Sequence, residues 1–290
     1  MKVFPNCVPC HFEQLKRVIT FMELPDEKAF ELYKKACEAF SSVETDIAPV
    51  EMADVIYGLI EKELNVADVF REPKREANLL AMKIVRRIEE DPDRDSWPLE
   101  IYAKLSALGN HIDMGAHDVD LDRFEKEIIG NAFNLTFEKD DFSTFESRLD
   151  SAKVLLYILD NAGEIVFDKL FIGKISERYP ALKIYAAVRG RPIINDVTMA
   201  EAKFIKLDEV CEVINSESIY PGTILEKAGE AFQRIFREAD LIVAKGQGNF
   251  EGLSNEAGEK LYFCLMAKCD TISKYIGVKR GTSLFSNRLL

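Results

Sequence analysis

Four short polar segments in the second half of the chain each follow an apolar run, at residues 159–164, 188–196, 216–218 and 245–249. The apolar runs are typical of buried strands, and the carboxyl ends of parallel strands share one edge of an open sheet. Ligands bind at that edge. The four segments supply carboxylates, amides, a lysine and several glycines, so we expect a site there for one hard cation and one phosphate.

The cation ligands that we predict are Asp160, Asn161 and Asp196. Asp160 and Asn161 end the first strand, and Asp196 follows the next strand in the neighbouring loop. Carboxylate and amide oxygens suit magnesium, manganese or a similar octahedral ion. The alternative for the Asp160–Asn161 pair is a turn with a helix N-cap, which Gly163 would ease.

The anion site that we predict is the glycine-rich segment at residues 245–249, which follows a buried strand. Glycines let backbone N–H groups approach an anion, and the Lys245 ammonium adds a point charge. The segment matches neither the Walker pattern nor the dinucleotide fingerprint. The alternative is a tight turn with a solvated lysine.

Further polar residues could contact a substrate from neighbouring loops. Arg189 and Arg191 could clamp a phosphate or carboxylate, although arginines are commoner as surface residues. The segment at residues 109–113 could reach the sheet edge as a lid, or Gly109 could simply cap a helix. The candidate substrate-binding residues are Asn110, Asp113, Glu164, Arg189, Ser216, Gly246, Gly248 and Asn249.

The second half of the chain alternates apolar runs with helical patterns. Strands are expected at residues 154–159, 182–188, 209–214, 241–244 and 262–267, and helices at 165–179, 198–206 and 224–238. Continuous apolar runs indicate strands covered on both faces. Alternation of strands and helices implies right-handed crossovers. The predicted fold class is therefore α/β, with a Rossmann-like, doubly wound, mainly parallel sheet.

The first half of the chain reads as helical almost throughout. Apolar residues recur at intervals of three and four over residues 8–21, 26–40, 49–64, 73–90 and 97–108. No segment there has a clear strand pattern. We therefore predict an all-helical N-terminal domain at residues 1–145, acting as a cap or lid, and an α/β metal- and phosphate-binding domain at residues 146–290.

Composition excludes several classes of partner. The net charge of −12 argues against a nucleic-acid groove or an anionic membrane surface as the main partner. No apolar stretch approaches the roughly 20 residues that a membrane helix requires, and the N-terminus lacks an apolar signal core. We expect a cytoplasmic protein whose partner is a small molecule; the sequence leaves its oligomeric state open.

Cys7 and Cys10 form a CxxC motif with metal-type or redox spacing. A structural zinc site needs four ligands, and only Cys37 and His111 are further candidates in this half. A thioredoxin-like motif would follow a strand within a βαβ unit, whereas this motif lies near the start of the sequence, where no strand is predicted. The remaining alternative is a helix start whose thiols pack inward.

Taken together, the segments at residues 159–164, 195–198 and 245–251 resemble the metal-dependent damage-control phosphatase family, long catalogued as a domain of unknown function. The CxxC resembles that of its stand-alone archaeal and bacterial-type branch. The resemblance implies hydrolysis of small phosphomonoesters, such as sugar phosphates or damaged phosphometabolites, with one divalent cation (manganese, cobalt, nickel or magnesium). It assigns that cation to Asp160, Asn161 and Asp196, and the phosphate to Lys245.

The nucleophile and two rival functions stay open at this stage. Metal-activated water is favoured over an aspartyl-phosphate formed on Asp160 or Asp196. An S-adenosylmethionine-dependent methyltransferase would need a glycine-rich loop after the first strand, where this chain has Asp160 and Asn161. A non-enzymatic metal- or metabolite-binding module would use the CxxC as its active feature.

Overall fold

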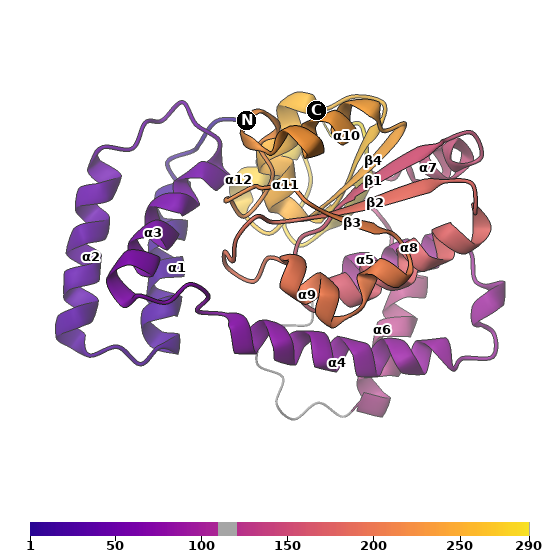
Figure 1. Ribbon diagram of the computed structural model, residues 1–290, viewed down its shortest axis with the longest axis horizontal. Helices are drawn as coiled ribbons and strands as arrows, with labels where there is room; N and C mark the ends of the chain where they lie inside the picture. The colour runs from indigo at the N-terminus through magenta and orange to yellow at the C-terminus, as the bar shows by residue number, and fades with distance from the viewer. Residues whose placement is uncertain (110–120, 290) are drawn as a thin grey trace.

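A six-stranded sheet lies between two layers of helices (Figure 1). The computed structural model describes residues 1–109 and 121–289, with the side chains of residues 121–126 left out. The strand order is β3-β2-β1-β4-β5-β6, and all neighbours pair in parallel except β5 with β6. The strands are β1 (Val154–Ile158), β2 (Lys183–Val188), β3 (Glu212–Asn215), β4 (Leu241–Lys245), β5 (Leu261–Met266) and β6 (Ser283–Ser286).

The helices begin and end close to their sequence signals. For example, Thr198 caps its helix by accepting a hydrogen bond from the backbone of Ala200, and the Thr198 backbone N–H donates to the Glu201 carboxylate. The α-helices are α1 (Cys7–Phe21), α2 (Asp26–Ser41), α3 (Pro49–Leu64), α4 (Arg71–Glu89), α5 (Leu99–Leu108), α6 (Leu121–Asn134), α7 (Phe142–Leu149), α8 (Glu164–Arg178), α9 (Met199–Phe204), α10 (Glu230–Glu238), α11 (Gly246–Leu253) and α12 (Asp270–Ile276).

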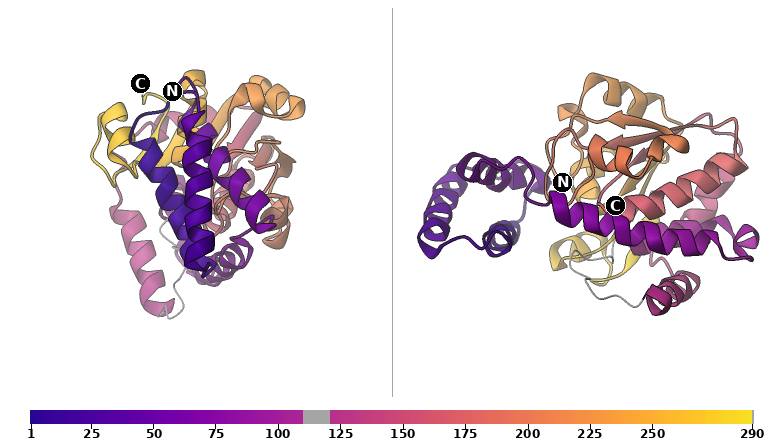
Figure 2. Two further views of the ribbon diagram at one scale, coloured as in Figure 1. Left: turned by 90° about the vertical axis from the view of Figure 1, so that its left-hand side faces the viewer. Right: turned by 60° about the horizontal axis from the view of Figure 1, so that its bottom comes forward.

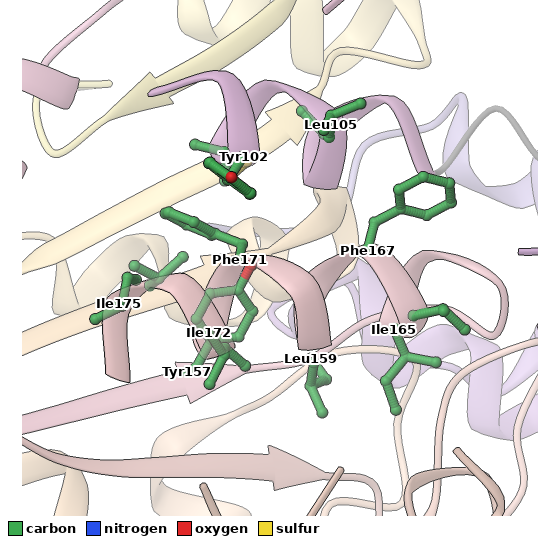
Figure 3. Packing of buried hydrophobic residues seen from close by; sticks show 14 of the residues in the cluster. Tyr102, Leu105, Tyr157, Leu159, Ile165, Phe167, Phe171, Ile172 and Ile175 are labelled. Atoms are coloured by element: carbon green, nitrogen blue, oxygen red, sulfur yellow. The ribbon is translucent and has the colours of Figure 1, made fainter. Parts of the chain in front are cut away.

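The central strand β1 is buried on both faces, as its unbroken apolar run predicts. Leu155 and Tyr157 join the core under α4, α5 and α8, whereas Leu156 and Ile158 join the core under α10, α11 and α12. Alternate residues of a strand point to opposite faces, so one run of apolar residues serves two cores. On the first face α5 packs on α8. Phe171 of α8 packs edge to face on Tyr157, with the ring centres 6.2 Å apart (Figure 3).

Helices α1 to α3 form a separate unit to one side of the sheet (Figures 1 and 2). This unit has its own small core, in which Leu15, Val18 and Ile56 are fully buried. Helix α3 contacts α11, and Arg191 after β2 forms ion pairs with Asp54 and Glu61 of α3. The unit therefore sits over the carboxyl ends of β2 and β4.

The predicted fold class is confirmed, and several elements differ locally from the prediction, among them the following three. Strand β6 is absent from the sequence prediction, because four residues are too few for a clear pattern and its antiparallel course breaks the alternation. The helix expected at residues 224–238 is a 3₁₀ turn at Leu225–Lys227 followed by α10, since Gly229 separates the two. The glycine-rich segment after β4 is helical and begins α11 directly.

The division into domains at residues 1–145 and 146–290 stays a prediction. The cores follow another grouping: α4 and α5 belong to the same core as the sheet, and only α1 to α3 have a core of their own. Residues 138–141 hydrogen-bond to the outer side of β6, through the pairs Glu138–Ser283, Asp141–Phe285 and Phe285–Lys139. The segment expected to be the junction thus adds to the edge of the sheet.

No helix in the described ranges combines the length and the apolar character needed to cross a membrane.

An aromatic cluster ties α7 to the C-terminal strands and provides a test of the core. Phe145 is fully buried and contacts Tyr262 and Phe285 edge to face, each at 5.3 Å. We expect Phe145→Ala to lower the free energy of unfolding by about 3–5 kcal/mol, because it leaves a cavity. Phe30→Ala, at a side chain that is 67% exposed, should change it by less than about 1 kcal/mol. Chemical denaturation of both variants checks this, and equal effects would contradict it.

Candidate active site

Asp160, Asn161 and Asp196 lie together at the carboxyl ends of β1 and β2. Asn161 and Asp196 form an antiparallel β-bridge, and the backbone N–H of Val197 donates to the carbonyl of Asp160 at 2.9 Å. All three side chains are buried. Local backbone pairing therefore joins the loop after β1 to the loop after β2 and brings together the cation ligands predicted from the sequence.

A single buried guanidinium lies between the two carboxylates. Arg189 donates from Nε to Asp196 Oδ2 at 2.7 Å, and its second terminal nitrogen lies 3.5 Å from Asp160 Oδ1. Its first terminal nitrogen donates to the Thr223 hydroxyl at 3.2 Å. The sequence offers Arg189 as a possible clamp for a substrate anion or as a surface residue; in this structure its guanidinium is buried and contacts the two aspartates.

Asn161 connects these carboxylates to a third one. Its amide nitrogen donates to Asp160 Oδ2 at 2.6 Å and to Glu164 Oε2 at 3.2 Å. Burial raises the pKa of Asp160 well above its usual range, and the charges of Asp196 and Glu164 raise it further. Carboxylates crowded in this way favour a proton or a metal ion beside them.

Lys245 is fully buried at the end of β4 and forms the second cationic centre. Its ammonium lies 2.8 Å from Glu164 Oε1 and 2.9 Å from Asp168 Oδ1, and it donates to the hydroxyl of Ser106 at 2.5 Å and to the Ser106 carbonyl at 3.1 Å. Burial alone would lower its pKa, but Asp168 and Glu164 raise it well above the usual value. Lys245 is therefore a permanent cation with a full set of acceptors, and phosphate would have to replace one of them.

The glycine-rich segment packs against the site as the first turn of α11. Gly246 has φ +78°, and a Cβ built on it would lie 1.9 Å from Asp160 Oδ2, so only glycine fits there. A Cβ on Gly248 would lie 1.9 Å from the Pro221 carbonyl oxygen. Asn249 donates to the carbonyls of Leu159 and Lys245. These residues fix the backbone around Asp160.

The remaining predicted site residues divide into two groups. Ser216 is buried, donates to the Val188 carbonyl at 2.7 Å and accepts from the backbone of Ser218, which closes the loop after β3. Asn110 and Asp113 lie outside the described residues.

The first half of the chain contributes polar residues that sequence reasoning missed. Asn78 of α4 accepts a hydrogen bond from the Gly163 backbone at 2.7 Å, and the fully buried Lys74 forms ion pairs with Asp68 and Glu201. Ser106 of α5 binds Lys245. The sequence did carry a signal for these residues: each is a polar residue on the apolar face of a predicted helix. Such a residue needs a buried hydrogen-bonding partner.

Two further residues near the site were also missed, one from each half of the chain. Asp168 of α8 accepts hydrogen bonds from Tyr157 at 2.7 Å and from Ser106 at 2.6 Å. Tyr57 of α3 lines a small cavity with residues 191–194, and burial together with the charge of Asp196 raises its pKa. The N-terminal helical unit thus places a phenol near one of the predicted cation ligands.

The residues present fit a divalent cation. The donor set consists of hard carboxylate and amide oxygens. Four buried carboxylates, those of Asp160, Glu164, Asp168 and Asp196, contact two buried cations, Arg189 and Lys245. The carboxyl groups therefore outnumber the cations four to two, and burial raises the pKa of Asp160, Asp168 and Asp196. Within the described part of the chain, no three His, Cys, Asp or Glu side chains form a metal-binding group, but the predicted set combines two carboxylates with an amide.

The CxxC motif starts α1, and its thiols lie near the start of α12. Burial raises the pKa of Cys7 and of Cys10, and nearby Glu251 and Cys269 raise both further. All six cysteines are free thiols. Cys7 is half-buried and Cys10 is exposed, so the thiols do not both pack inward, and the role of the motif stays open.

Comparisons with known proteins agree on one family. The family model described as damage-control phosphatase ARMT1-like domain matches residues 3–284. The chain is 31% identical over 288 residues to a damage-control phosphatase of Archaeoglobus fulgidus, covering 97% of each. It is 30% identical over 296 residues to an uncharacterized protein of Methanocaldococcus jannaschii, covering 99% of this chain and 96% of that one.

A solved structure is also similar. The crystal structure of a DUF89 family protein from Pyrococcus horikoshii, at 2.04 Å resolution, superposes with a TM-score of 0.92 at 28% identity and covers 98% of both chains.

Glu251, beside the CxxC motif, gives a pH-dependent test. Burial raises its pKa from 4.5 to about 7, although Gln247 and the N-terminal amine oppose the rise. The unfolded chain ionises first, so the free energy of unfolding should fall as pH rises from 4.5 to 7 and stay level above 7. The loss should be on the order of 3 kcal/mol.

Glu251→Gln should remove this part of the pH dependence, while Glu230→Gln at an exposed position should leave it in place. Urea denaturation across this pH range checks the difference. Parallel curves for wild type and Glu251→Gln would contradict it.

Proposed function

We propose that this chain, which belongs to the damage-control phosphatase ARMT1-like family, is a divalent-metal-dependent phosphatase. Its substrates are small phosphomonoesters, such as sugar phosphates or damaged phosphometabolites, and its ion is manganese, cobalt, nickel or magnesium. It works in the cytoplasm on small phosphorylated metabolites. Family membership supports the phosphatase role; the ion, substrates and location are our inference.

One observation carries the proposal: Asp160, Asn161 and Asp196 are buried together, in a cluster where four carboxyl groups contact only two cations. Carboxylates out of water are costly unless cations balance them. A structure that gathers them at a ligand-binding sheet edge is best explained by a cation that binds there. In our proposal Asp160, Asn161 and Asp196 hold the ion. A divalent cation supplies charge stabilisation for the phosphoryl group and lowers the pKa of water.

The chain's own residues position these ligands. Arg189 orients Asp196 through the 2.7 Å hydrogen bond and remains close to Asp160, so neither carboxylate swings freely. Asn78 fixes the turn after Asn161 through the Gly163 backbone. This preorganised set would meet the phosphoryl oxygens with no rearrangement of charge.

Lys245 and Glu164 form the second part of the proposed site. Lys245 holds Glu164 next to Asn161, and the ammonium also contributes positive potential where a phosphate would bind. We keep Lys245 as the phosphate-holding residue, with exchange of one of its present acceptors for a phosphate oxygen. Tyr57, near Asp196, would contact the ester from the side of α1 to α3.

The ligand assignment predicts a loss of turnover in isosteric variants. Asp160→Asn and Asp196→Asn should each lower kcat for p-nitrophenyl phosphate at least about 100-fold with manganese present, because each removes a charge that would hold the ion. Circular dichroism and denaturation should show that both variants fold.

Asp208→Asn, at an exposed position, is the control and should retain wild-type turnover. Wild-type activity in either folded site variant would overturn the assignment.

The contact between Gly246 and Asp160 predicts a second effect on activity. Gly246→Ala should displace the Asp160 carboxylate and lower kcat about 100-fold. Gly277→Ala is a matched control, because Gly277 has φ +80° and a Cβ there meets nothing within 4 Å.

Both substitutions strain a left-handed backbone by about 1–2 kcal/mol, but only the first should impair hydrolysis. Thermal denaturation measures the backbone strain in each variant, and steady-state kinetics measures the effect of displacing the Asp160 carboxylate. Equal turnover in the two variants would refute the proposed contact.

A further inference from the structure

We infer that the chain has a second ligand site, in the cavity between α4 and α8, which binds a small anion with an apolar body. The cavity has a volume of about 300 Å³, within the range of small-molecule sites. It is lined by the C-terminal half of α4, by residues 166–177 of α8, by Tyr102 of α5, and by Ile205 and Val210 beyond α9. The inference does not depend on the proposed phosphatase function.

The cavity is separate from the candidate active site. Glu164 and Asp168 at the start of α8 contact Lys245, whereas Val166, Leu170 and Gly173 of the same helix line the cavity. Figure 1 shows α4 running alongside α8.

Its charge favours an anion in a protein that is acidic overall. Four cationic side chains line the cavity, against the two carboxylates of Glu89 and Glu177. Lys169 and Arg94 are already paired with Glu209 and Asp95, so the positive charge open to a ligand rests on the other two cations. The cationic side chains are Arg86, Arg94, Lys169 and Lys174.

Lys174 is the best-placed cation. Its side chain is 8% exposed, and its ammonium lies 6.0 Å from the centre of the Tyr102 ring. Its carboxylate partners, Glu177 at 3.0 Å and Asp95 at 3.6 Å, are both highly exposed. Solvent screens such pairs, so a ligand carboxylate or phosphate entering the cavity can displace them.

Arg86 provides a second contact at the mouth of the cavity. It is exposed, and no ion pair or hydrogen bond of its side chain occurs among the described residues. Between the cations the wall is apolar, through Met82, Val85, Val166 and Leu170. An occupant with one anionic group and an aromatic or aliphatic body of about ten non-hydrogen atoms matches this lining.

Phenylacetate is a suitable probe, and phenylacetamide is its neutral counterpart of the same shape. The ring centre of Trp97, the chain's one tryptophan, lies 6.1 Å from that of Tyr102, which lines the cavity, so its fluorescence reports on the cavity. We expect a saturable change in Trp97 fluorescence with phenylacetate and at least tenfold weaker binding of phenylacetamide. Equal affinities, or no saturable binding of phenylacetate, would overturn the inference.

Three variants locate the binding. Gly173→Leu fills the cavity, since a Cβ there makes only an ordinary 3.4 Å contact with Val210, and it should abolish binding without lowering Tm. Gly130→Leu in α6, where a Cβ meets nothing within 4 Å, is the matched control and should bind as wild type. Arg86→Gln should weaken binding of phenylacetate about fivefold and leave that of phenylacetamide unchanged. Unaltered binding by Gly173→Leu would place the probe elsewhere and refute the site.

Discussion

The cost of burying carboxylates away from water governs this structure. Asp160 and Asp196 share Arg189, and Glu164 and Asp168 share Lys245, so each pair of acids is held by one buried cation. Removing one partner of such a set leaves a buried charge without compensation, which is strongly destabilising. The two centres meet at Asn161, whose amide bonds to one acid from each pair. Fold and site are therefore stabilised by the same contacts.

This constraint also explains why helices from the first half of the chain are needed. Asp160, Asp196 and Lys245 lie at one edge of the sheet, but not all of their hydrogen-bonding partners come from the sheet and its loops. Helix α5 brings Ser106 to Lys245, and α4 brings Asn78 to the turn after Asn161. Helix α3 closes over the loop after β2 through Arg191. The helical half is thus part of the site as well as a cover for the sheet.

The layers of the fold could be predicted from the sequence, because period and turn signals are local. The joint position of Asp160, Asn161 and Asp196 followed from strand ends alone. The partners of Lys245 could not be foreseen, because Ser106 and Asp168 reach it only through the packing of α5 on α8. Glycines suggested a loop after β4, whereas Gly246 is required by contact with Asp160 and the segment continues as a helix. Strand β6 is too short to show a pattern.

The backbone of residues 138–141 along the outer side of β6 has a consequence for behaviour at high concentration. An open strand edge offers unpaired N–H and C=O groups to a second molecule and so seeds aggregation. Here that side of the sheet is already occupied by the chain itself, and the opposite edge is β3, a strand of only four residues. Both edges of the sheet are thereby poor templates for edge-to-edge pairing with a second molecule.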